Sequence, residues 1–344
     1  MKKRFGASVT MLVALTLGAT MLSGLSATGS LSATARQHQQ TVAAHAAFVK
    51  YMSSHAPMIR GNVSPPAVTT SPGVTESASL NWSGFADTPV ATSPSQSVSS
   101  VSAQWTVPRV SCINGQYRNQ DVFLAQWVGL DGYNSNTVEQ LGTATQCYQG
   151  VEYYYDWYEM FPNGTVEEGP AQCISNNQNC IEPGDRIQAS VISTPDGANN
   201  SYALKLTDFS NQQESFDIPS VTCPAATCVN SSAEWIVERP AFAVAGFQIL
   251  PQADYGQTAF YDGTVGVGSA RPTSIDRYNG AVNDIWMIDD SLSYVLSCPG
   301  QQGPPGQLLT LPLSEQGTGN IANSPCGPTN AWGGNFPVTW DASF

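Results

Sequence analysis

From residue 78 onward the chain consists of short runs of β-branched and aromatic residues separated by Gly, Pro, Asn and Asp, and this pattern restricts its fold most. Such runs form strands, and the residues between them form turns. Hardly any stretch has the 3.6-residue apolar period of a helix. We therefore expect an all-β domain, and a single β-sandwich is common at this size. The runs are SVSSVSAQWTVP, DVFLAQWVGL, VEYYYDWYEMF, DRIQASVIS, SYALKLTDF, AEWIVERP, DIWMIDD and LSYVLSC.

Charge divides this β-rich part from the residues before it. Six of the 13 basic residues precede residue 78, where Glu76 is the single acidic residue. The remaining 267 residues carry seven basic and 25 acidic side chains, a net charge of −18. All three histidines, His38, His45 and His55, also lie before residue 78.

Residues 78–344, here called the body, contain no histidine, which excludes several kinds of catalytic and metal site. Ser-His-Asp triads, Cys-His pairs and histidine-bearing zinc sites all need an imidazole. The acidic excess argues against nucleic-acid binding, which requires Lys and Arg to face phosphate. We expect no metal and no cofactor, and chemistry carried out by carboxylates, amides, hydroxyls or tyrosines. The density of carboxylates favours an acidic medium, where protonation relieves repulsion.

The N-terminus has the layout of a secretory signal peptide. Lys2-Lys3-Arg4 precedes an uncharged run that is most apolar from about Val9 to Leu22, and small residues follow near positions 27 and 35. We assign residues 1–35 to the signal, with cleavage near 27 or 35, and expect a secreted, extracellular protein. An uncleaved membrane anchor is the alternative, but the residues after Leu22 suit a spanning helix poorly. Since no later segment could span, we expect no stable membrane association after cleavage.

Residues 36–77 are interpreted as a basic propeptide and linker. A helix is expected from Gln37 to about Met58, with Val42, Ala46, Val49 and Met52 as its apolar stripe. Residues 62–77 (NVSPPAVTTSPGVTES) indicate an exposed linker that a protease could cut. A disordered tail is the alternative. At neutral pH the basic segment could lie across the acidic body and inhibit it, and protonation of carboxylates below about pH 4 should release it.

The body is expected to comprise a β-sandwich domain over residues 78–298 and a Gly/Pro-rich C-terminal extension over residues 299–344. Eight cysteines in an exported chain predict up to four disulfides. Only the close pairs Cys173–Cys180 and Cys223–Cys228 are proposed. We expect a monomer.

Three strands present a carboxylate on one face. Period-two alternation groups Trp127 with Gly129 and Asp131, Tyr155 with Trp157 and Glu159, and Glu234 with Ile236 and Glu238. Two of these faces also carry Trp, which suits the binding of an extended polymer, either peptide or polysaccharide. Equally, a strand Glu is usually solvated and a strand Trp usually belongs to the core.

Five segments resemble, in order and spacing, the signature segments of the glutamic peptidases, also called eqolisins. They are Asn81-Trp82-Ser83-Gly84, Trp127-Val128-Gly129-Leu130-Asp131-Gly132, Glu139-Gln140-Leu141-Gly142, Trp157-Tyr158-Glu159-Met160-Phe161-Pro162 and Ala233-Glu234-Trp235-Ile236-Val237-Glu238. The resemblance covers about residues 80–290. It implies an antiparallel sandwich of two large sheets, like the concanavalin or lectin jelly rolls, and a secreted acid endopeptidase insensitive to pepstatin.

Carried over residue by residue, the resemblance places the catalytic pair on Gln140 and Glu238. Trp127, Asp131, Trp157 and Glu159 would line or support the substrate cleft, with Trp82 at its edge. Such a pair can hydrolyse a peptide bond without a covalent intermediate. A glutamate can take a proton from water and return it to the departing amine, while an amide stabilises the oxyanion and holds the water.

The sequence departs from the family pattern at several points. Tyr155 stands where the fungal enzymes have Asp, and Asp156 one place later should face the other way unless a bulge re-aims it. Arg239-Pro240 replaces an acidic continuation after Glu238, and the arginine side chain should point away from that glutamate. The cysteine expected after the GxDG turn is missing.

Two other functions stay open at this stage. A retaining or inverting glycoside hydrolase would also use strand carboxylates, and it would tolerate Gln140→Glu. A lectin-like binding module would use the tryptophans as platforms without turnover, and Glu238→Gln would leave ligand binding intact.

Overall fold

The computed structural model describes residues 32–52, 57–61, 74–89, 97–112, 121–167, 181–196, 199–223, 228–242, 248–288, 295–299 and 336–340. Within these residues the chain is almost entirely β-strand, as the sequence predicted, with one α-helix near the N-terminus. The helix α1 covers Ala33–Met52. The first strands are β1 (Val74–Ser79), β2 (Trp82–Thr88), β3 (Val98–Thr106), β4 (Val122–Leu130), β5 (Val138–Tyr148), β6 (Val151–Phe161), β7 (Val166–Glu167), β8 (Arg186–Asp196) and β9 (Asn199–Asp208). The later ones are β10 (Phe216–Thr222), β11 (Ala233–Glu238), β12 (Ala241–Phe242), β13 (Gln248–Ile249), β14 (Gln257–Val267), β15 (Thr273–Ser274), β16 (Ala281–Ile288), β17 (Val295–Pro299) and β18 (Phe336–Trp340). Two 3-10 turns, η2 (Gln212–Glu214) and η3 (Ile275–Arg277), complete the list.

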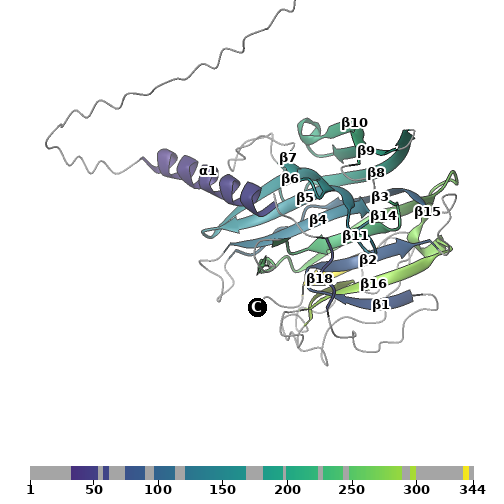
Figure 1. Cartoon of the computed structure of the whole chain (residues 1–344). Helices are drawn as coiled ribbons and strands as arrows, with labels where there is room; N and C mark the ends of the chain where they lie inside the picture. The colour runs from purple at the N-terminus through teal and green to yellow at the C-terminus, as the bar shows by residue number, and fades with distance from the viewer. Residues whose placement is uncertain are drawn as a thin grey trace, which may run out of the picture.

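The strands form two large, mainly antiparallel layers (Figure 1). One layer has the order β10-β9-β8-β3-β14, and the other has the order β16-β2-β11-β4-β5-β6-β7. The short strands β18 and β17 connect β14 to β16, so the hydrogen-bonded path is continuous from one layer to the other. The expected sandwich of two sheets is confirmed, with the two layers joined along one edge.

A shared apolar core lies between the layers. Trp105 and Val191 from one layer pack in the same cluster as Val128 and Trp235 from the other. Two indole N–H groups also cross the interface: Trp105 Nε1 donates to Thr143 Oγ1 at 3.1 Å, and Trp235 Nε1 donates to the Ser102 carbonyl at 2.9 Å. Because buried polar groups need partners, these bonds fix how the layers face each other.

A second cluster lies on the opposite, outer face of the layer that contains β4, β5, β6 and β11. It includes Trp82, Trp127, Trp157 and Ile236, together with residues of α1. Strand alternation therefore gives these strands two apolar faces, one on the inter-sheet core and one beneath the helix. In β11, Ile236 lies in this outer cluster, whereas Trp235 and Val237 lie in the inter-sheet core.

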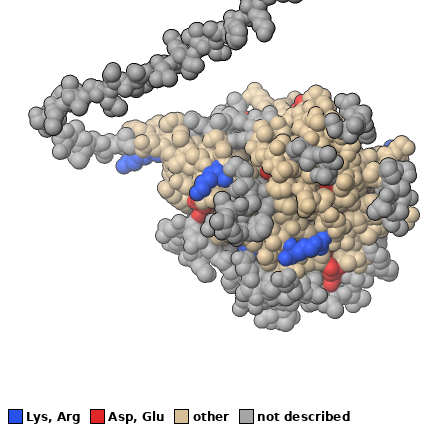
Figure 2. Space-filling view, in the orientation of Figure 1, with Lys and Arg blue, Asp and Glu red and all other residues tan. Residues whose placement is uncertain are grey.

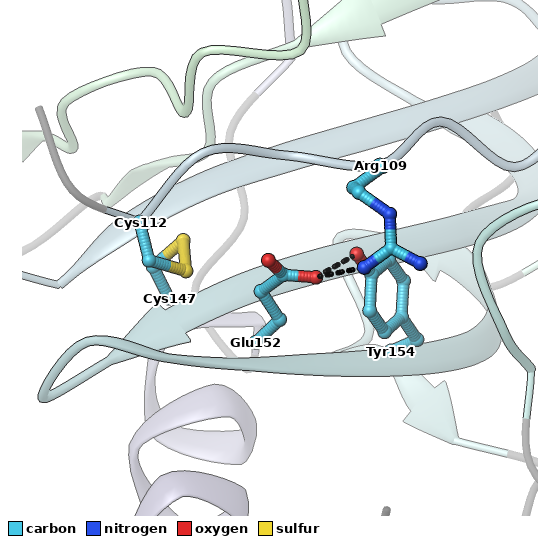
Figure 3. A network of polar contacts seen from close by, with 5 residues as sticks. All are labelled: Arg109, Cys112, Cys147, Glu152 and Tyr154. Atoms are coloured by element: carbon cyan, nitrogen blue, oxygen red, sulfur yellow. Dashed lines mark hydrogen bonds and ion pairs between the residues drawn. A yellow bond between two sulfur atoms is a disulfide. The ribbon is translucent and has the colours of Figure 1, made fainter.

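A disulfide and a polar network secure one end of the β5–β6 hairpin (Figure 3). Cys112, after β3, is bonded to Cys147 in β5. Beside it, Tyr154 donates to Glu152 at 2.7 Å, and Arg109 lies 3.6 Å from the same carboxylate. The predicted Cys223–Cys228 disulfide is confirmed. The predicted Cys173–Cys180 pair lies outside the described residues, and Cys112–Cys147 was not anticipated.

Two features of the N-terminal segment differ from expectation. The helix ends at Met52, and its buried face is formed by Thr41, Ala44, Phe48 and Met52, whereas Val42 and Val49 are 42% and 46% exposed. Of the predicted stripe, Met52 is buried, but the expectation is wrong for Val42 and Val49 because the tertiary partners select a neighbouring face. The expected linker also includes the start of β1, since Val74–Ser79 pairs in parallel with β16. No helix among the described residues is long and apolar enough to cross a membrane.

Candidate active site

The two candidate catalytic residues lie on the outer face, on either side of strand β4. Glu238 is paired with Ala125, and Gln140 is paired with Gly129, in single-register antiparallel ladders. Trp127 occupies the position of β4 midway between these two partners. A substrate group lying over Trp127 would therefore have the carboxylate on one side and the amide on the other.

Glu238 is fully buried and both of its carboxylate oxygens accept hydrogen bonds. Trp127 Nε1 donates to Oε2 at 2.8 Å, and Asn81 Nδ2 donates to Oε1 at 3.0 Å. The donors come from β4 and from the turn before β2, the strands on either side of β11. Bonds to both oxygens fix the rotation of the carboxylate.

Gln140 is held by a carboxylate on the next strand. Its Nε2 donates to Glu159 Oε2 at 2.6 Å, and the two residues are direct partners in the β5–β6 ladder. The other oxygen of Glu159 lies 3.3 Å from the Thr165 hydroxyl. An amide nitrogen carries two hydrogens, and Glu159 accepts one of those of Gln140.

Tryptophan rings form the apolar part of the outer face. Trp82 meets Trp127 edge-on, with ring centroids 4.9 Å apart and planes at 78°, and Trp157 is fully buried nearby. Two glycines make room for this packing. A Cβ at Gly142 would lie 2.6 Å from Trp127 Cβ, and one at Gly129 would lie 2.9 Å from the Trp127 ring. Larger residues at these positions would displace the indole that bonds Glu238.

Asp131 stands apart from the other predicted site residues. It adopts a left-handed conformation (φ 67°) just after β4, which ends the strand alternation expected to group it with Trp127. Its carboxylate accepts four bonds, from the main-chain N–H of Val229, Asn230 and Ser231 and from the Ser231 hydroxyl. Asp131 therefore holds the loop that leads into β11 and supports the site from a distance.

Several acidic residues of the body are buried, and burial raises their pKa. Burial raises the pKa of Glu139 and of Glu234 well above the usual range, and the nearby Asp131 adds to the rise. Burial also raises the pKa of Asp87. The surface charge is thus smaller than the composition suggests, and Figure 2 shows few, scattered charged groups on the viewed face.

The helix α1 packs on the outer face through apolar contacts. Phe48 is 1% exposed and stacks on Tyr155 of β6, with centroids 4.0 Å apart and planes at 16°. Tyr51 meets Phe123 edge-on at 4.9 Å. The Met52 carbonyl, at the end of the helix, accepts a bond of 2.7 Å from the Thr165 hydroxyl. Thr165 thus lies between the helix and Glu159, the partner of Gln140.

Residues 57–61 lie in an extended conformation beside Glu238. Gly61 N donates to the Ala78 carbonyl at 2.9 Å, and Leu80 N donates to the Ile59 carbonyl at 2.8 Å. Asn81 continues the ladder with its side chain, since Oδ1 accepts from Ile59 N at 2.8 Å and Nδ2 lies 3.3 Å from the Pro57 carbonyl. The N-terminal segment therefore reaches residues next to both candidate catalytic groups.

Sequence reasoning did not select two residues that the structure brings to the site. Asn81 is the first residue of the Asn81-Trp82-Ser83-Gly84 segment, so the family resemblance could have indicated it. No sequence motif singles out Thr165, because its contacts with Met52 and Glu159 depend on the fold. Among the described residues, no group of three or more His, Cys, Asp or Glu is placed to hold a metal ion.

A protein-family comparison identifies the class of the chain. The family model described as "Peptidase A4 family" matches residues 80–298, which carry Trp82, Trp127, Gln140, Trp157, Glu159 and Glu238.

The chain belongs to the peptidase A4 family.

Membership in the A4 family makes the protein a peptide hydrolase of the glutamic type. Among solved structures, the chain is similar to aspergilloglutamic peptidase from Aspergillus niger, at 18% identity and a TM-score of 0.41, over 64% of this chain and 99% of that one. A search of curated protein sequences finds no match.

The departures from the A4 pattern have structural explanations. Strands β5 and β6 pair in one register along their length, so Asp156 opposes Thr143 and faces away from Tyr155 and Trp157. Asp156 therefore does not replace the missing family aspartate, and α1 packs on Tyr155 instead. Arg239 points away from Glu238, since its guanidinium donates to the carbonyls of Leu80 (2.6 Å) and Ile288 (3.1 Å).

Proposed function

We propose that the protein is a secreted acid endopeptidase, made as a precursor, in which Glu238 and Gln140 activate water to cleave peptide bonds. The observation that carries the proposal is the arrangement around Trp127. Glu238 is fixed by Trp127 and Asn81 on one side, and Gln140 is fixed by Glu159 on the other.

In the proposed reaction, the scissile carbonyl lies over Trp127 between the two groups. Glu238 removes a proton from water, the water oxygen attacks the carbonyl carbon, and the negative charge moves to the carbonyl oxygen. The second N–H of Gln140 donates to that oxygen, while Oε1 of Gln140 holds the attacking water. Glu238 then gives the proton to the departing amine, so no covalent intermediate forms.

The role of Glu159 in this proposal is to orient the amide. With one N–H bonded to Glu159 at 2.6 Å, the other N–H and Oε1 of Gln140 are fixed in direction. An oriented donor needs no rearrangement as charge develops, which is why such groups contribute strongly to rate. The tryptophans supply the apolar walls for substrate side chains.

We propose that residues 36–77 inhibit the precursor. The packing of Phe48 on Tyr155, the bond from Thr165 to the Met52 carbonyl and the position of residues 57–61 beside Asn81 support this role. The contacts are mainly apolar and main-chain, so they differ from the charge attraction expected from composition. Charge would act at longer range and would favour release as carboxylates are protonated.

Secretion is proposed from the N-terminal residues and from the disulfides. Lys2-Lys3-Arg4 and the apolar run after it lie outside the described residues, whereas Cys112–Cys147 and Cys223–Cys228 suit an oxidising compartment. N-terminal sequencing of protein recovered from the medium would locate the mature end, and protein retained whole in membranes would contradict secretion.

The decisive test of the catalytic assignment is casein digestion at acidic pH, with pepstatin present throughout. We expect wild type to digest casein and Glu238→Gln to lose activity, since an amide cannot take a proton from water. Glu214→Gln is the matched control, because Glu214 is also a buried carboxyl but lies on η2, near the other layer. Cleavage that survives Glu238→Gln would refute the assignment.

A further inference from the structure

We propose that Asn81 and the chain edge Ala78–Leu80 form a subsite for the main chain of an extended peptide substrate, on one side of the scissile bond. The proposal rests on the peptidase function proposed above. The subsite is filled in this structure by residues 57–61 of the chain itself.

The first support is the way in which residues 57–61 are bound. They pair antiparallel with residues 78–80, through the Gly61 N to Ala78 carbonyl and Leu80 N to Ile59 carbonyl bonds. The Ser79 hydroxyl donates to the same Ile59 carbonyl at 3.1 Å. These bonds engage main-chain atoms of the bound segment, so any extended peptide other than one with proline at a donating position could replace it.

The second support is the geometry of the Asn81 side chain. Its Oδ1 accepts from Ile59 N at 2.8 Å, and its Nδ2 lies 3.3 Å from the Pro57 carbonyl, two residues earlier. By accepting from Ile59 N and donating to the Pro57 carbonyl, the Asn81 side chain makes the two hydrogen bonds that the main chain of a neighbouring strand would make. Asn81 thereby extends the ladder at the point where its own main chain turns into β2.

The third support is the distance to the catalytic base. The same Nδ2 donates to Glu238 Oε1 at 3.0 Å, so a peptide held by Asn81 lies one side chain from the carboxylate. Asn81 is 0% exposed, and its Oδ1 lies 3.1 Å from the Ser79 hydroxyl. Because Asn81 is held rigidly beside Glu238, the residue of the substrate that it binds determines which peptide bond lies next to the carboxylate.

Arg239 holds this subsite in place from behind. Its main-chain N–H donates to the Asn81 carbonyl at 3.0 Å, and its side chain donates to the Leu80 carbonyl at 2.6 Å. Arg239, which departs from the family pattern, thus holds Leu80 and Asn81, the two residues of the turn before β2.

The test uses a fluorogenic peptide that wild type cleaves, and a set of copies that each carry one N-methyl group along the main chain. N-methylation removes one main-chain donor from the peptide. Methylation of the N–H that faces Asn81 Oδ1 should therefore lower kcat/KM of wild type about tenfold relative to the unmethylated peptide, which is the effect of one hydrogen bond. With Asn81→Leu, the same N-methyl group should change kcat/KM less than about twofold. The control Asn283→Leu removes another buried amide, which bonds the Ala86 carbonyl, and should keep the wild-type profile.

A binding measurement covers the case in which Asn81→Leu also lowers turnover through Glu238. Fluorescence anisotropy would compare binding of the same peptides to Glu238→Gln and to Glu238→Gln/Asn81→Leu, after added wild-type enzyme has processed both variants. The N-methyl group should raise Kd about tenfold for Glu238→Gln and less than about twofold for the double variant. An unchanged N-methyl profile in the Asn81→Leu proteins would overturn the subsite. Failure of wild type to cleave any peptide would instead overturn the proposed function.

Discussion

The docking of α1 on the outer face offers a quantitative test through Phe48. A synthetic peptide of residues 33–61 should inhibit the processed enzyme, and Phe48→Ala in that peptide should weaken inhibition strongly. Phe48 is 1% exposed and stacks on Tyr155 at 4.0 Å, so its removal exposes apolar surface on both partners.

The magnitude follows from the burial of the ring. Replacing a buried Phe by Ala in a protein core costs about 3–5 kcal/mol. We take the lower end, about 3 kcal/mol, because the face beneath the helix is solvated once the peptide leaves. At 1.36 kcal/mol per factor of ten, the inhibition constant should rise about 150-fold.

Val49→Ala is the matched control. Val49 lies on the same helix but is 46% exposed, so its loss should change the inhibition constant less than about threefold. Both substitutions improve helix propensity by similar amounts, since Phe and Val rank close together. The assay is cleavage of a fluorogenic peptide by processed enzyme over a range of inhibitor concentrations. Equal inhibition constants for the Phe48→Ala and Val49→Ala peptides would refute the packing argument.

Three further predictions concern catalysis and pH. Gln140→Ala should lower kcat by about 10²–10³, and Gln140→Glu should not restore it; near-wild-type peptide cleavage by Gln140→Glu would contradict the role of Gln140 as an amide donor. Burial raises the pKa of Glu214 from 4.5 to about 7, with Asp208 and Asp185 adding to the rise. Above pH 4.5 the unfolded chain therefore loses a proton that the folded chain keeps, so stability should be full below pH 4.5 and fall as pH rises to about 7. Melting temperatures followed by circular dichroism should show this fall, and Glu214→Gln should reduce it; an equal fall in the variant would contradict the assignment. Finally, purified precursor should be processed faster at pH 3.5 than at pH 7, and equal rates would argue against charge-dependent release of residues 36–77.

Much of the site could be predicted from the sequence because strand alternation is local. The side-chain period of two fixes which residues of a strand share a face, and it correctly grouped Tyr155 with Trp157. The all-β class followed from composition and turns in the same local way. The family segments indicated Gln140 and Glu238, which the structure places on one face with β4 between them.

Local reasoning failed where a residue left the regular strand. Asp131 adopts a left-handed conformation, and its carboxylate binds the loop at residues 229–231, about 100 positions later. Period-two alternation therefore did not predict which way its side chain points. The helix stripe failed for a related reason. Helical spacing offers neighbouring faces of similar hydropathy, and the rings of Tyr155 and Phe123 select the one that contains Phe48.

The sequence by itself determined the β class, the family segments and a body without histidine, which leaves carboxylate and amide chemistry. The tertiary structure decided which chain segments meet. Strand β11 lies between β2 and β4, so Asn81 and Trp127, distant in sequence, both bond Glu238. It also brought residues 57–61 to the Asn81 turn. Sheet order is set by the burial of both faces of a layer, a property of the whole chain that no single segment encodes.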